Sequence, residues 1–316
     1  MDLCRLQKTL SKVHISMTTL LGPVLVVVTD LAARLLGHSL FRRHFPLLLS
    51  STVLFGPALS PWVSKHSIFA NKNHYLYRLF LRSCWGWTCI FTGSFLFLLT
   101  FSIRPSLILS LRHLSRLAAT GLLWSLCRHL LSLLLDASGS CYEPLRSPPG
   151  GQGGPGGGLG PGVMGKDRLL LFREGQGKAA CLRAGLIWRG PEVSEDTLVL
   201  FLCCLVLTEE MAVFRPCLAL LRPLAAPLRL LFLFCVALLA LWLFLLLSLL
   251  AHFPQFTSQL LGGAVGFLTW KGLYQGWYRL GPSWYCPGLP GEGLLVSTDD
   301  GQDKRRLNMN LYHCNK

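Results

Sequence analysis

The chain has 316 residues, of which 52% are hydrophobic and only 14% are charged. That charged share is about half of what a soluble globular domain carries, so composition excludes an ordinary water-soluble enzyme and a disordered chain. The 30 lysines and arginines against 15 acids give a net charge of +15. These basic residues are spread between apolar runs, which argues against a nucleic-acid-binding face and favours loops that flank membrane spans.

Apolar runs follow one another along the whole sequence, at about 17–36, 46–63, 83–103, 117–135, 197–214, 228–250 and 260–278. Each is near the length at which a helix crosses about 30 Å of hydrocarbon. The first run is the weakest, because Asp30 and Arg34 interrupt its end, and whether it crosses is left open. The sequence therefore predicts an all-α polytopic membrane helix bundle over 1–316, with six spans and seven as the alternative.

The distribution of lysine and arginine between the runs indicates an orientation. The 251–259 turn has none and is placed in the lumen. The loop expected at 104–116, with Arg104, Arg112 and Arg116, and the 279–316 tail are then cytosolic. A long lumenal loop at 136–196 contains a Gly/Pro-rich insert, 148–165, that is typical of a flexible linker.

Charged residues inside apolar runs are costly and need partners. Glu209 and Glu210 lie late in the fifth run and Lys271 lies inside the last. Both positions are about 16–20 Å from the expected lumenal surface, so Lys271 is predicted to neutralise one of the two carboxylates. The alternative is that the lysine extends alone toward the cytosolic interface.

The cysteines and histidines show no spacing that would build a metal site, so neither a metal nor a cofactor is expected. Cys141 and Cys181 lie in the same long loop, and in an oxidising lumen they would form a disulfide. At the end of that loop, Ser194 or Asp196 suits the N-cap of the next helix.

Several segments, in this order and spacing, resemble the fat storage-inducing transmembrane (FIT) family: 83–89 (SCWGWTC), 112–117 (RHLSRL), 139–145 (GSCYEPL), 181–185 (CLRAG), 201–205 (FLCCL), 209–214 (EEMAVF) and 262–266 (GGAVG). The segment 32–37 (AARLLG) and the extra N-terminal apolar run point to one branch of that family. On this resemblance, Phe201, Glu209, Glu210 and Lys271 are candidate lipid-contact or structural residues.

Membership would imply a multi-pass protein of the endoplasmic reticulum membrane. Such proteins bind diacylglycerol and triacylglycerol and promote lipid-droplet formation and fat storage, and homo-oligomerisation is left open. Another branch of the family acts as a lumenal acyl-CoA diphosphatase, which uses one histidine as nucleophile and a second as proton donor.

This sequence departs from the diphosphatase pattern at both positions. Asp196 stands where the first histidine is expected, and Pro254 replaces the second in the 253–257 turn. Proline offers no side-chain base, and an aspartate at its usual pKa is a poor acid at pH 7. His252 lies two residues from Pro254 and is the candidate substitute. We therefore expect lipid binding without catalysis, and a lumenal lipid hydrolase is the alternative.

Overall fold

The computed structural model describes residues 22–63, 67–71, 73–144, 169–173, 178–190, 192–218, 226–280 and 286–294. It divides into two compact units. The first, here called the helical unit, comprises Met1–Trp124 and Ser194–Lys316, and the second, the loop unit, is Ser125–Val193. The Gly/Pro-rich insert and most of the 279–316 tail lie outside the described residues.

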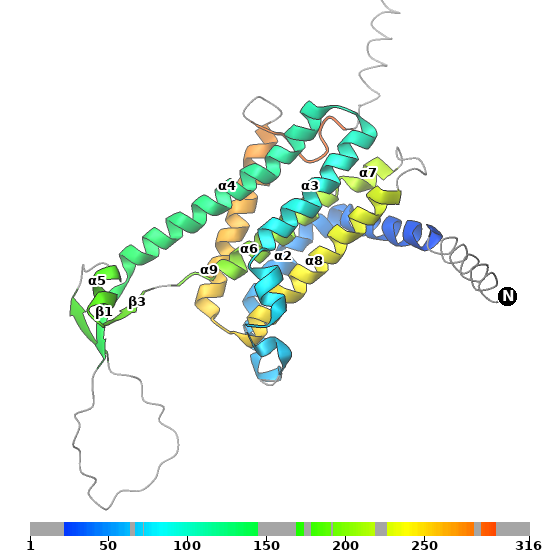
Figure 1. Ribbon diagram of the computed structural model, residues 1–316. Coiled ribbons are helices and arrows are strands. Elements are labelled where there is room, and N and C mark those ends of the chain that lie inside the picture. Colours follow the sequence, from blue (N-terminus) through cyan, green and yellow to red (C-terminus); the bar gives the residue numbers. More distant parts are fainter. Residues whose placement is uncertain are drawn as a thin grey trace, which may run out of the picture. The chain divides into compact units, whose positions relative to one another are not determined.

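The helical unit consists of helices joined by short connections (Figure 1). Its first helix, Gly22–Leu36, bends by 72° into Ser39–Trp62, which comprises α2 (Ser39–Phe55) and η1 (Gly56–Trp62). The elements that follow in this unit are η2 (Ile68–Ala70), η3 (Tyr77–Leu81), α3 (Cys84–Ile103), the first part of α4 (Leu107–Ser138), α6 (Glu195–Met211), α7 (Phe214–Leu218), α8 (Ala226–His252), α9 (Phe256–Trp270), η4 (Lys271–Gly276) and η5 (Trp277–Leu280).

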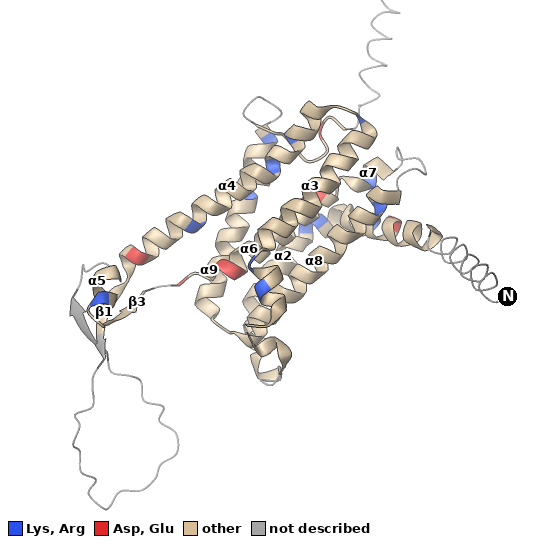
Figure 2. Cartoon of the chain, viewed as in Figure 1, with Lys and Arg blue, Asp and Glu red and all other residues tan. Residues whose placement is uncertain are grey.

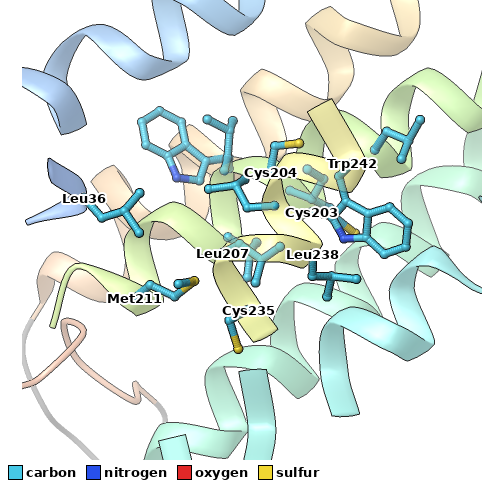
Figure 3. Packing of buried hydrophobic residues seen from close by; sticks show 14 of the residues in the cluster. Leu36, Cys203, Cys204, Leu207, Met211, Cys235, Leu238 and Trp242 are labelled. Carbon is cyan, nitrogen blue, oxygen red and sulfur yellow. The ribbon is translucent and has the colours of Figure 1, made fainter. Parts of the chain in front are cut away.

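Helix α6 is the central helix of this unit. In the stretch Glu195–Leu218, 94% of the most apolar window is buried inside the protein, against 39% for α3 and for α8. It packs against α9, α8, α3 and α2, so its surroundings are protein rather than lipid. Figure 3 shows part of the apolar core that results, with these residues labelled: Leu36, Cys203, Cys204, Leu207, Met211, Cys235, Leu238 and Trp242.

Small residues allow α9 to approach α6 closely. A Cβ atom at Gly262 would lie 2.5 Å from the carbonyl oxygen of Ser194, and one at Gly266 would lie 3.2 Å from that of Leu198. Both contacts are with backbone, which cannot move aside as a flexible side chain can. The glycines of this segment therefore serve helix packing.

The described residues confirm a helical membrane protein. Four helices are long and apolar enough to cross a membrane: α3, α4, Glu195–Leu218 and α8. The bent pair Gly22–Leu36 and Ser39–Trp62 would be a fifth. Charged residues are few and scattered along the helices (Figure 2). The count of six is not confirmed by this inventory and remains a prediction.

Helix α4 begins earlier than the apolar run at 117–135 suggests. Only Arg104–Ser106 separates it from α3, and α4 starts at Leu107. Pro105 disfavours helical backbone at the residue before it, whereas the leucine-rich residues after Ser106 continue a helix readily. The prediction that 104–116 is a loop is therefore wrong for most of its length, and Arg112 and Arg116 are helical residues.

The loop unit contains the rest of α4, the short helix α5 (Lys178–Arg183) and an antiparallel sheet in the order β2-β1-β3. The strands are β1 (Ser140–Pro144), β2 (Leu169–Arg173) and β3 (Ile187–Arg189). In the pairing, Cys141 lies opposite Arg173 on one side and Trp188 on the other. Within the described residues this small sheet departs from an all-α architecture, and it was not predicted.

A disulfide joins Cys141 of β1 to Cys181 of α5, across a sequence separation of 40. Both cysteines are fully buried. Lys178 and Asp136 form an ion pair with N–O distance 2.9 Å, which links α5 to the end of α4. Among the described residues, the disulfide is therefore the covalent link between the sheet and α5, and the exposed ion pair adds little to stability.

Candidate functional site

The start of α6 carries Asp196, at the position where the resemblance places the first catalytic histidine. Ser194 is the N-cap of α6, and its hydroxyl accepts a hydrogen bond from the Thr197 amide at 3.3 Å, so the predicted N-cap is confirmed at Ser194. Asp196 is exposed in the first turn, where a negative charge complements the helix dipole.

The turn between α8 and α9 carries Pro254 and is fixed by one side chain. The Gln259 amide nitrogen donates to the carbonyl of Phe253 at 2.7 Å, and its oxygen accepts from the Gln255 amide at 3.3 Å. The amide of Ser194 donates to the carbonyl of Ser258 at 3.0 Å. The structure therefore brings the two segments that carry Asp196 and Pro254 together, as a shared site requires.

His252 is the last residue of α8 and does not belong to the irregular turn. Its Nδ1 lies 2.9 Å from the carbonyl oxygen of Ser248, one helical turn back. Its Nε2 is buried and has no hydrogen-bond partner within the described part of the chain. The imidazole is thereby tied to its own helix.

The other end of α6 holds a buried ion pair. The Nε and Nη2 atoms of Arg116 donate to the two carboxylate oxygens of Glu210 at 2.9 and 2.8 Å. Both side chains are 0% exposed. This two-point geometry is the strongest form of arginine–carboxylate contact, and complete burial makes each partner dependent on the other.

Further hydrogen bonds complete the surroundings of this pair. Tyr274 donates its hydroxyl to Glu210 at 2.9 Å, and Arg116 Nη1 lies 2.7 Å from Nδ1 of the buried His113. The Tyr278 hydroxyl donates to the carbonyl of Arg116 at 3.0 Å. Three elements distant in sequence, namely α4, α6 and the η4–η5 segment, are joined at this point.

The prediction that Lys271 neutralises Glu209 or Glu210 is wrong. In the described residues Arg42 pairs with Glu209 and Arg116 with Glu210, and no carboxylate lies within ion-pair distance of Lys271. The exposed lysine instead places its ammonium 5.9 Å from the centre of the Phe267 ring. The prediction compared only the expected depths of these residues, and depth does not determine which side of a helix a residue occupies.

Phe201 is a core residue of α6, 1% exposed. Its Cδ1 would lie 3.3 Å from a Cβ at Gly266 of α9, so Phe201 fills the space between these two helices.

Among the described residues no group of three or more histidine, cysteine, aspartate or glutamate side chains could hold a metal ion.

These observations define a helical multi-pass membrane protein. One end of its central helix has the first turn of α6 with Asp196 beside the exposed turn around Pro254, here together called the polar turn. The other end has the buried ion pair. The chain is 62% identical over 290 residues to fat storage-inducing transmembrane protein 1 of Danio rerio, covering 90% of this chain and 95% of that protein. It is 40% identical over 267 residues to the Mus musculus protein of the same name, covering 84% and 83%.

The chain therefore belongs to the fat storage-inducing transmembrane family. A more distant relative is acyl-coenzyme A diphosphatase FITM2 of Xenopus laevis, 30% identical over 253 residues, which cover 79% of this chain and 87% of that protein. The higher identities place the chain on the transmembrane protein 1 branch. No family model and no solved structure matches the chain.

Proposed function

We propose that this protein induces fat storage from the endoplasmic reticulum membrane, by binding diacylglycerol and triacylglycerol and promoting lipid-droplet formation. The observation that carries the proposal is the 62% identity to a fat storage-inducing transmembrane protein over 95% of that protein's length. At that identity and coverage we expect the two chains to share their arrangement of spans and loops.

The physical mechanism rests on the apolar outer surface of the helices. On the first part of α4, Leu107, Ile108, Leu111 and Leu122 are 69–83% exposed. In a bilayer these side chains contact acyl chains at no cost in hydration. Neutral glycerolipids lack a charged head group and dissolve between the leaflets, so a helix bundle with such a surface can raise their local concentration.

The polar turn supports lipid binding without phosphoanhydride hydrolysis. Asp196 and Pro254 occupy the two positions where the resemblance expects histidines, and neither supplies an imidazole near pH 7. His252 is bonded to its own helix. The second candidate function is a lumenal acyl-CoA diphosphatase. It is favoured by the 30% identity to the relative named for that activity and by Nε2 of His252, which has no hydrogen-bond partner among the described residues.

The proposed topology has six spans, with both chain ends cytosolic and the loop unit in the lumen. The disulfide between Cys141 and Cys181 supports the lumenal placement, because such bonds persist in oxidising compartments and are rare in the cytosol. Helix α9 has only 15 residues, but η4 and η5 continue the helical run to Leu280. That run is long enough to serve as the last span.

The test is a binding isotherm for radiolabelled triacylglycerol with the full chain purified in detergent. We expect saturable binding that unlabelled triacylglycerol and diacylglycerol displace. Binding no stronger than that of an unrelated polytopic protein of equal size would contradict the proposal. In parallel, acyl-CoA turnover is measured with the same preparation, because hydrolysis that His252→Ala abolishes would favour the diphosphatase instead.

A further inference from the structure

A polar pocket of about 500 Å³ lies beside Glu209, about 20 Å along α6 from Asp196. Its polar lining comes from Arg42 of α2, Glu209 of α6, Gln275 of η4 and Arg279 of η5. Tyr274 and the apolar residues Leu289 and Pro290 complete it. The volume is within the range of about 300–1,000 Å³ that small-molecule sites occupy.

The lining has an excess of positive charge and of hydrogen-bond donors. One guanidinium nitrogen of Arg42 pairs with Glu209, while Arg279 has no carboxylate within ion-pair distance among the residues that the structure describes. The Tyr274 hydroxyl is already committed to Glu210. Two guanidinium groups and an amide therefore line the pocket with one carboxylate. Arg279 acts on Glu209 only through its charge, and in the described residues neither Arg279 nor Gln275 donates a side-chain hydrogen bond.

Guanidinium groups bind phosphate oxygens through two parallel N–H donors. The Arg42 side chain is 43% exposed and Arg279 is exposed, so both are accessible to a ligand that enters the pocket. The apolar Leu289 and Pro290 offer a surface for the carbon atoms next to a phosphate. A neutral diacylglycerol would leave the net positive charge of the lining without a counterion.

We propose that this pocket binds the phosphate group of a phosphate ester, and that Arg279 is its principal anchor. The ligand is either the head group of an anionic glycerolipid or a soluble phosphate ester of similar size. The lining includes neither Asp196 nor Pro254, so the pocket is a different site from the polar turn. If the pocket did not bind phosphate, the proposed function in fat storage would still stand.

The experiment uses the full chain in phosphatidylcholine nanodiscs and three probes: dioctanoyl phosphatidate, dioctanoylglycerol and glycerol 3-phosphate. The first two differ only in the phosphate. We expect phosphatidate to bind, and Arg279→Gln to weaken that binding about tenfold or more, as expected when a charged hydrogen-bond donor is lost. Dioctanoylglycerol affinity should not change in this variant.

The matched control is Arg43→Gln, which removes the same charge from an exposed position next to Arg42 that does not line the pocket. We expect it to change phosphatidate affinity less than twofold. Competition by glycerol 3-phosphate would identify a soluble ester as the ligand, and its failure to compete would identify a lipid head group. Equal losses in Arg43→Gln and Arg279→Gln, or equal binding of dioctanoylglycerol to the pocket, would overturn the proposal.

Discussion

The two ends of α6 differ in whether their charged side chains are exposed or buried. At its start, Asp196 is exposed in a capped first turn, and the neighbouring turn around Pro254 is held by amide and backbone hydrogen bonds. At its end, Glu210 and Arg116 are fully buried and bonded to each other at two points. We therefore expect the first end to tolerate substitution, and we expect the second end to lose stability when one partner of its ion pair is removed.

The comparison teaches where function and stability reside in this helix. An exposed polar turn contributes little to folding, so its residues can change from those of an enzyme while the bundle persists. The buried ion pair joins α4 to α6, and Tyr274 adds η4 to the same cluster, so removing only one partner of the pair should be costly. We expect substitutions at the Asp196 end to change activity, and substitutions at the Glu210 end to change the stability of the fold.

The largest expected effect is a gain of activity at the Asp196 end. The double variant Asp196→His/Pro254→His should hydrolyse acyl-CoA about 100- to 10,000-fold faster than the unaltered chain, the contribution of general acid–base catalysis. Turnover of acyl-CoA by purified protein measures this. The control Asp196→Asn/Pro254→Ala changes both sites without adding imidazole and should stay at background. A gain in that control would show that the imidazoles are not responsible.

The next effect concerns folding at the Glu210 end. Arg116→Met leaves a buried carboxylate without its partner and should lower the free energy of unfolding by about 3–5 kcal/mol, measured by thermal unfolding in detergent. The double variant Arg116→Met/Glu210→Leu should recover a large part of that loss, because no buried charge remains. If the double variant were as unstable as the single one, the ion pair would not be the cause.

A smaller effect is expected from breaking the seam between α6 and α9. Gly262→Leu would place a Cβ against the Ser194 carbonyl and should cost about 1–3 kcal/mol, as overpacking does. Gly272→Leu is the matched control, because a Cβ there has nothing within 4 Å. Equal thermal stability of the two variants would contradict the close approach of these helices.

The smallest effect is predicted for the more exposed ion pair. Arg42→Gln removes the partner of Glu209, but the Arg42 side chain is 43% exposed, and solvent-accessible pairs contribute only about 0–1 kcal/mol. Unfolding measurements should therefore place this variant within 1 kcal/mol of the unaltered chain. A loss as large as that of Arg116→Met would mean that both pairs are equally structural.

Much of the helical framework could be predicted because long apolar runs in a membrane protein have few alternatives to helix. The runs at 83–103 and 228–250 correspond closely to α3 and α8. Ser194 was one of the two predicted N-cap residues of α6. The two cysteines expected to form a disulfide in the long loop, Cys141 and Cys181, are joined in the structure. Local chemistry determines each of these features.

The partners of the buried charges could not be found in the same way. Arg116 was assigned to a cytosolic loop because counting basic residues treats each of them as a surface residue. Only its packing against α6 reveals that it is buried beside Glu210. The segment 112–117, which carries family resemblance, offered the one available signal. The short strands of the loop unit were not predicted, because three to five residues are too few to show the alternation of apolar and polar side chains that indicates a strand.

The central position of α6 also constrains how the protein is made. Glu210 enters the membrane with α6, and a carboxylate in hydrocarbon is costly until it is paired. Arg116 has already been synthesised by then, whereas Tyr274 emerges 64 residues later. During biosynthesis α6 therefore has its cation available from the start, but its surrounding helices close only once α9 has been inserted. Until then the most deeply buried helix of the finished protein must be sheltered by the insertion machinery or by lipid.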